Sequence, residues 1–176
     1  MKLCIYGAGG FGKEVYDIAA RINKLKNSWE EILFVVDKPY VNEKVYKGRL
    51  ICIDDIVNEM DIDSFEIIIA GGEPGIRKKL FHKVKLMKLN IATLIDSTAL
   101  VSDTAVLGEG VIIAPFSNIT SSTVLGNNVS INAHTTVGHD IIIGNHSVIS
   151  TNVTIGGNST IGSETFIGLG AQTKEK

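Results

Sequence analysis

One histidine in the second half of the chain has the residue pattern of a general base. His139 is followed directly by Asp140, and the residue 18 positions later is Gly157. A histidine that is oriented by a carboxylate can accept a proton near neutral pH. If residues 18 apart are neighbours in space, Gly157 leaves room beside the imidazole and offers a backbone N–H to a developing oxyanion. A surface histidine beside an unrelated aspartate fits the same residues about equally well.

The spacing of 18 comes from a six-residue repeat that runs to Gln172. The leading residue of each repeat is aliphatic, and Ala, Val, Ser, Thr or Ile follows it after four residues. A short fixed period of this kind predicts a parallel β-helix, in which each repeat supplies one short strand and one corner. Three repeats make one triangular coil, so residues 18 apart stack at the inter-strand spacing of about 4.8 Å. The leading residues are Val101, Leu107, Ile113, Ile119, Leu125, Ile131, Val137, Ile143, Ile149, Ile155, Ile161 and Ile167.

The histidines of the repeat also raise a metal hypothesis. His134 and His139 are five residues apart, as in certain trimeric β-helical carbonic anhydrases, whose third histidine lies two coils earlier. In this sequence that position is Thr98. Because a catalytic zinc site needs three protein ligands and a water, we expect no metal here. We expect His146 to be an ordinary corner residue.

The start of the chain has a motif that can hold a phosphate. A short apolar strand leads into Gly7-Ala8-Gly9-Gly10-Phe11-Gly12, which opens a helix. The backbone N–H groups of such a turn can cradle a phosphate, although a tight turn without a ligand fits about equally well. A second strand ends at Asp37, near the place of the ribose-binding acid in a dinucleotide fold. Only one β-α-β-α-β unit precedes the repeat, so a dinucleotide would have half a site, whereas a nucleotide sugar still fits.

Composition limits the partners and the location. The chain has 176 residues, of which 44% are hydrophobic and 20% charged, as in an ordinary globular protein. The net charge of −2 and the lack of a basic run argue against a nucleic-acid partner. No stretch approaches the roughly 20 apolar residues of a membrane span, so we expect a cytoplasmic protein. Cys4 and Cys52 lie in apolar runs and are expected to be buried thiols.

The sequence resembles the NeuD/PglD-type sugar O- and N-acyltransferases. The resemblance rests on the glycine-rich start at residues 7–13, on residues 71–77 and 92–95, and on Asn132 followed after seven residues by His139. It covers essentially the whole chain. It implies an α/β Rossmann-like domain at residues 1–97 that binds the acceptor, followed by a left-handed β-helix of hexapeptide repeats at residues 98–176.

The resemblance also implies roles for individual residues. His139 is the general base, Asp140 orients it, and Gly157 and Asn132 belong to the oxyanion and acyl-CoA site. Acetyl-CoA is the co-substrate and lies between neighbouring β-helices of a homotrimer. The candidate substrate-binding residues of the first domain are Gly7, Gly9, Gly10, Phe11, Gly12, Asp37 and Lys38.

Three features depart from the family pattern. Phe11 stands where the family motif usually has a histidine, and Val148 aligns with a second histidine that touches the acyl group in many members. Family members usually continue through further repeats, so we expect either that part of the coenzyme A site is missing or that the sequence is truncated at its C-terminus.

The resulting hypothesis is a sugar or nucleotide-sugar acyltransferase that uses direct attack on the thioester. The residues leave open whether an amine or a hydroxyl is acylated, and which sugar carries it. The alternative is a non-catalytic module that binds nucleotide sugars or assists assembly. Binding of acetyl-CoA distinguishes the two, because a binding module has no reason to hold a thioester.

Overall fold

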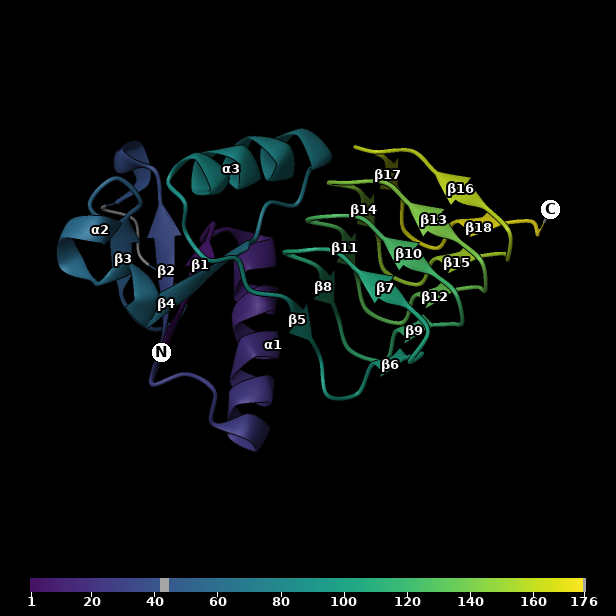
Figure 1. Ribbon diagram of the computed structural model, residues 1–176, viewed down its shortest axis with the longest axis horizontal. Helices are drawn as coiled ribbons and strands as arrows, with labels where there is room; N and C mark the ends of the chain where they lie inside the picture. The colour runs from purple at the N-terminus through teal and green to yellow at the C-terminus, as the bar shows by residue number, and fades with distance from the viewer. Residues whose placement is uncertain (42–44, 176) are drawn as a thin grey trace.

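The first half of the chain forms a parallel sheet with helices on both faces (Figure 1). The computed structural model describes residues 1–41 and 45–175. The strands are β1 (Lys2–Tyr6), β2 (Glu31–Val36), β3 (Leu50–Cys52) and β4 (Phe65–Ile69), in the spatial order β3-β2-β1-β4. The helices are α1 (Gly10–Lys26), α2 (Ile56–Glu59) and α3 (Pro74–Leu86), with short 3-10 helices at Lys38–Tyr40 and Ile62–Ser64.

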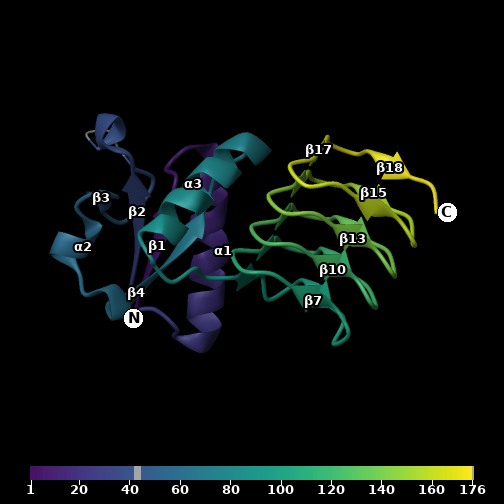
Figure 2. The same cartoon turned by 45° about the horizontal axis from the view of Figure 1, so that its top comes forward.

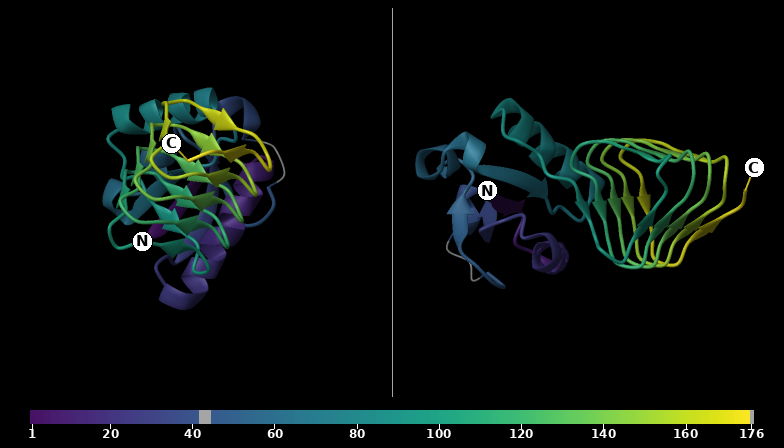
Figure 3. Two further views of the ribbon diagram at one scale, coloured as in Figure 1. Left: turned by 90° about the vertical axis from the view of Figure 1, so that its right-hand side faces the viewer. Right: turned by 60° about the horizontal axis from the view of Figure 1, so that its bottom comes forward.

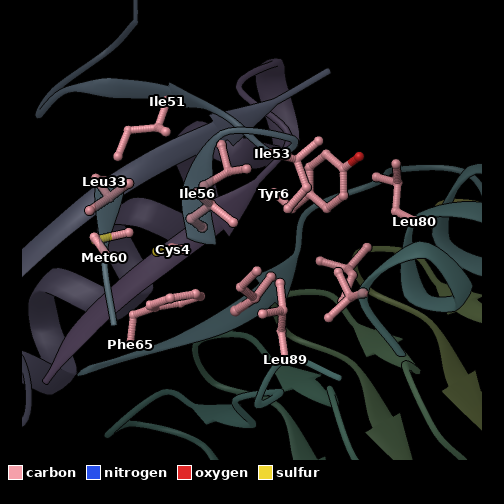
Figure 4. Packing of buried hydrophobic residues seen from close by; sticks show 14 of the residues in the cluster. Cys4, Tyr6, Leu33, Ile51, Ile53, Ile56, Met60, Phe65, Leu80 and Leu89 are labelled. Carbon is pink, nitrogen blue, oxygen red and sulfur yellow. The ribbon is translucent and has the colours of Figure 1, made fainter. Parts of the chain in front are cut away.

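Strand β1 shows how the sheet separates two cores. Successive side chains of a strand point to opposite faces, so Leu3 and Ile5 pack toward α1 while Cys4 and Tyr6 pack toward α2 and α3. Both cysteines of the chain are buried free thiols. Figure 4 shows the second of these cores, where the hydroxyl of Tyr6 points out of the apolar cluster.

The edge strand β3 is an element that the sequence pattern did not indicate. It has only three residues, and it pairs in parallel with β2. A run of three apolar residues is too short to show a period, and it takes its place at the sheet edge by pairing with β2, the strand before it in the chain.

The second half of the chain is the predicted left-handed β-helix, whose two-residue strands form three parallel sheets (Figure 2). The first sheet contains β5 (Leu94–Ile95), β8 (Ile112–Ile113), β11 (Ser130–Ile131), β14 (Val148–Ile149) and β17 (Phe166–Ile167). The second contains β6 (Leu100–Val101), β9 (Asn118–Ile119), β12 (Thr136–Val137), β15 (Thr154–Ile155) and β18 (Gln172–Thr173). The third contains β7 (Val106–Leu107), β10 (Val124–Leu125), β13 (Ile142–Ile143) and β16 (Thr160–Ile161).

The register of these sheets is 18 residues, as the repeat predicts. Val137 of β12, for example, pairs with Ile119 below it and Ile155 above it. The leading residues of the central repeats fill the interior and are at most 1% exposed. Between the sheets, the chain turns at a residue with positive φ every six positions, such as Asn128, Asp140 and Asn152. Asn and Asp tolerate this left-handed conformation better than most residues, which explains their frequency at the corners.

Helix α1 joins the two halves. One side of α1 packs on the parallel sheet, and the other lies against the first sheet of the β-helix, where Leu94 and Ile112 are fully buried. The other two sheets meet at the corner most remote from the N-terminal domain, as the position of the C-terminus shows in Figure 3. Within the described residues, no helix is both long and apolar enough to cross a membrane.

Candidate active site

The corner between β12 and β13 carries His139 and Asp140. Asp140 has a φ of 55°, and its carboxylate oxygen Oδ2 lies 2.8 Å from Nδ1 of His139. In the neutral tautomer that carries its proton on Nδ1, the N–H donates to the Asp140 carboxylate. The lone pair of Nε2 can then accept a proton from a substrate. The hydrogen bond and charge of Asp140 raise the pKa of His139 above its ordinary value of 6.5. The pair therefore has the geometry and the electrostatics of an oriented general base.

The imidazole lies directly against Gly157. A Cβ built on Gly157 would stand 2.7 Å from Nε2 and 2.8 Å from Cε1 of His139. The predicted stacking across one coil is therefore confirmed, and it requires glycine at this position. Among the hydrogen bonds of the described residues, none engages the N–H of Gly157. This donor beside the base is suited to stabilise a developing oxyanion.

A second carboxylate reaches the base from two coils further along the β-helix. The Oε1 atom of Glu175 lies 3.3 Å from Nε2 of His139, on the opposite side of the ring from Asp140. No motif in the sequence singles out this residue, although it stands 18 positions after Gly157.

The glycine-rich turn forms part of a cavity of about 380 Å³ at the carboxyl end of the parallel strands. Gly7 and Gly9 line it together with Asp37 and Lys79. Gly9 caps α1 without a side-chain hydrogen bond, and Cβ atoms at Gly9 or Gly10 would meet nothing within 4 Å. The start of α1 therefore has open space beside its backbone and no side-chain cap, which is compatible with a phosphate at the helix N-terminus.

Glycine at position 12 has a packing reason. A Cβ on Gly12 would overlap the carbonyl oxygen of Gly7, so this position needs glycine for the close turn itself. Gly10 and Gly12 are not among the residues that line the cavity.

Asp37 is held in place by two neighbours. Its Oδ1 accepts a hydrogen bond from the hydroxyl of Tyr6 at 2.8 Å and from Nζ of Lys83 at 2.9 Å. Burial raises the pKa of Asp37, but the bonds from Lys83 and Tyr6 outweigh it and leave that pKa below the ordinary value. The carboxylate is thus ionised and fixed at the cavity wall. Lys38 is exposed and does not line this cavity.

A second cavity, of about 310 Å³, lies between the N-terminal domain and the β-helix. Phe11 and Glu14 of α1 line one side, and Asn132 and Val148 of the β-helix line the other. The side-chain oxygen of Asn132 accepts a hydrogen bond from Ser130 at 3.1 Å. Asn132 and Phe11 therefore share this cavity, and the structure does not bring Asn132 to His139 and Gly157 of the same chain.

His146 occupies a corner, as expected, but it is not an ordinary one. It is 7% exposed, packs against Phe81 and His82 of α3, and its Nδ1 lies 3.0 Å from the side-chain nitrogen of Asn128. Burial lowers the pKa of His146. The repeat gives no sign of this burial, because the covering helix belongs to the other domain.

The zinc hypothesis receives no support from the side-chain positions. Thr98 uses its hydroxyl to donate a hydrogen bond to Asp96, and His134 stacks on Phe116 with ring centroids 5.0 Å apart. In residues 1–41 and 45–175, no three side chains of His, Cys, Asp or Glu are grouped so that they hold a metal ion.

Two family models and one curated protein match parts of the chain. Residues 2–84 match the family described as PglD N-terminal domain, and residues 122–157 match the bacterial transferase hexapeptide family. A GDP-perosamine N-acetyltransferase of Escherichia coli O157:H7 is 26% identical over 123 residues, which span 69% of this chain and 55% of that protein. The match therefore covers about half the length of this relative.

Solved structures match nearly the whole chain. The acetyltransferase domain of PglB from Neisseria gonorrhoeae FA1090, which was also solved with acetyl coenzyme A, superposes with a TM-score of 0.89 and 29% identity, over 99% of this chain and 82% of its own. WeeI from Acinetobacter baumannii AYE has the same fold, with a TM-score of 0.89 and 24% identity over 99% of this chain and 81% of its own. The two matched families, the fold and the sequence similarity together make the chain similar to the NeuD/PglD-type hexapeptide-repeat sugar acyltransferases.

Proposed function

We propose that this chain transfers the acetyl group of acetyl-CoA to an amino or hydroxyl group of a nucleotide-linked sugar. The observation that carries the proposal is the His139 ring, which has Asp140 at Nδ1 and rests on Gly157. The gonococcal PglB domain in complex with acetyl coenzyme A supports the choice of acyl donor. The E. coli GDP-perosamine N-acetyltransferase supports a nucleotide sugar as the acceptor.

In the proposed reaction, Nε2 of His139 takes the proton from the nucleophile as it attacks the thioester carbonyl. The N–H of Gly157 donates to the oxyanion, and Asp140 stabilises the imidazolium that forms. When the carbon–sulfur bond breaks, the imidazolium gives its proton to the departing thiolate. No covalent enzyme intermediate is needed, and the orientation of two bound substrates supplies several kcal/mol of the barrier reduction.

The acceptor nucleotide is proposed to bind at the start of α1. Gly9 and Gly10 leave space for a diphosphate at the helix N-terminus, and the fixed carboxylate of Asp37 can accept hydrogen bonds from ribose hydroxyls. The cavity that holds Phe11 and Asn132 is close to the same turn, because Phe11 follows Gly10 directly. We assign the sugar to this second cavity. Lys38 has no part in this assignment, because its side chain is exposed outside the cavity.

The proposal requires more than one copy of the chain. The acceptor cavities open beside the N-terminal domain, whereas β12 and β13, whose connecting corner carries His139, lie on the side of the β-helix away from that domain (Figure 1). The third sheet, which borders this corner, exposes a ladder formed by Val106, Val124 and Ile142. Exposed apolar surface of this kind is suited to contact with another subunit. We therefore propose a homotrimer in which the base of one copy faces the acceptor and Asn132 of the next.

We further propose a cytoplasmic location, where nucleotide sugars and acyl-CoA thioesters are both available as substrates.

The test is to replace His139 with alanine and to follow thiol release from acetyl-CoA with a panel of UDP- and GDP-linked amino sugars. We expect transfer to fall by about 100-fold or more, while the melting temperature and acetyl-CoA binding are kept. His134→Ala is the matched control, because His134 is an exposed histidine at a different corner. Near-normal turnover by the His139→Ala variant with each acceptor would show that another group is the base.

A further inference from the structure

The corner that holds His139 is one position in a column of residues spaced by 18. From the first coil onward the column reads Asp103, Ser121, His139, Gly157 and Glu175. The strand register β6-β9-β12-β15-β18 stacks these residues along the β-helix. Because Gly157 has no side chain, the carboxylate of Glu175 reaches past the coil of Gly157 to the imidazole of His139. Its Oε1 lies 3.3 Å from Nε2.

This contact lies where the acceptor must bind in the proposed reaction. A nucleophile has to approach within about 2.6–3.2 Å of Nε2 before its proton can be transferred. The other ring nitrogen, Nδ1, is already occupied by Asp140 at 2.8 Å. The side chains of His139 and Glu175 are 48% and 58% exposed, so a ligand can reach the space between them.

The charge of Glu175 distinguishes the two classes of acceptor. Aliphatic amines are protonated near neutral pH and form charge-assisted hydrogen bonds to carboxylates, whereas a hydroxyl brings no charge. We propose that Glu175 is a specificity-determining residue, whose carboxylate holds the ammonium group of an amino-sugar acceptor beside Nε2 of His139. The enzyme is then an N-acyltransferase. This inference rests on the proposed function and extends it to the class of acceptor.

The proton balance of the reaction is consistent with this arrangement. The ammonium first gives one proton to water by way of the Glu175 carboxylate and becomes a neutral amine. As the nitrogen–carbon bond forms, Nε2 of His139 takes a second proton. The carbon–sulfur bond then breaks, and His139 passes that proton to the thiolate. The products are the amide, coenzyme A as its thiol, and one proton in solution.

The experiment compares Glu175→Gln with the unmodified chain. From UDP- and GDP-linked 4-amino-4,6-dideoxyhexoses, the acceptor with the fastest turnover is chosen, and its 4-hydroxy counterpart is used as a competitive inhibitor. We expect Glu175→Gln to raise the KM of the amine about fivefold or more and to leave the inhibition constant of the hydroxyl compound unchanged. Asp103→Asn is the control, because it removes a carboxylate from the same column two coils away from His139.

The outcomes separate the inference from the function on which it rests. Suppose that the unmodified chain transfers acetyl groups. If Glu175→Gln then leaves the KM of the amine unchanged, or raises that KM and the inhibition constant of the hydroxyl compound equally, the role of Glu175 is wrong and the proposed function stands. An equal effect of Asp103→Asn would indicate a general charge effect and would also overturn the inference. If the unmodified chain acetylates none of these acceptors, both proposals fail together.

Discussion

Replacement of Gly157 by alanine tests the stacking on which the proposed site depends. The new Cβ would lie 2.7, 2.8 and 3.0 Å from three atoms of the His139 ring. Carbon atoms pack best at about 3.5–4.0 Å, so the ring has to move by roughly 0.8 Å or more. The φ of Gly157 is not positive, and the ring is half exposed, so the fold can accept the methyl group at little cost.

The movement should therefore affect catalysis more than stability. It breaks the 2.8 Å contact with Asp140 or displaces Nε2, and a misplacement of about 1 Å costs roughly 100-fold in rate. The N–H of Gly157 is retained in alanine, so a loss of activity reports on the position of the base alone. We expect kcat/KM for acetyl transfer, followed by thiol release, to fall by about 100-fold, while the melting temperature stays within a few degrees.

A matched alanine variant is available at Gly162. Its Cβ would meet only the Thr165 hydroxyl oxygen, at 3.8 Å, and its φ is not positive either. Gly162→Ala should leave kcat/KM unchanged. Full activity in Gly157→Ala would refute the position of the His139 ring, and equal losses in both variants would refute the steric argument.

Two further predictions address the electrostatics and the domain contact. Asp140→Asn removes the main cause of the raised pKa of His139. Since the base must be unprotonated to act, the acidic limb of the pH profile of kcat/KM should move to lower pH. We also expect kcat to fall about tenfold or more. An acidic limb that does not move would contradict the role of Asp140. Asn128→Ala removes the side-chain oxygen that accepts a 2.7 Å hydrogen bond from the fully buried Arg77, and should lower the free energy of unfolding by about 1–3 kcal/mol in urea titrations. Asn152→Ala, which has the same left-handed backbone at an exposed corner, should cost clearly less, and an equal cost would contradict the argument.

The β-helix was predictable almost residue by residue because its rules are local and periodic. Each repeat meets the same environment, so the aliphatic leading positions give the register, and the register gives the stacking of Gly157 on His139. The same arithmetic reaches Glu175, one further step along the column. Its role was missed because a corner carboxylate near the end of the chain resembles any other solvated residue in the sequence.

The relation between the two domains was not predictable in this way. Arg77 and Asn128 are 51 positions apart, and neither lies in a pattern that shows their contact. Arg77 donates to the backbone oxygens of Ile69 and Gly71 as well as to Asn128, so this cation ties the end of β4 and the start of α3 to a coil of the β-helix. The burial of His146 follows from the same contact. Such contacts depend on how two independently patterned surfaces meet, and that information is not periodic.

Asn132 shows how a prediction from motif spacing combines with one from the geometry of the coil. Motif spacing grouped it with His139, but a step of seven residues is longer than one side of the triangular coil, so the two side chains leave the β-helix from different corners. Asn132 lines the cavity beside the N-terminal domain, whereas His139 is not among the residues that line it. A base and an acceptor cavity on different faces of one chain can meet only through a head-to-tail contact between copies. In the proposed homotrimer, that contact repeats around a three-fold axis and closes into a ring, so that every copy gives its base to one neighbour and its cavity to the other.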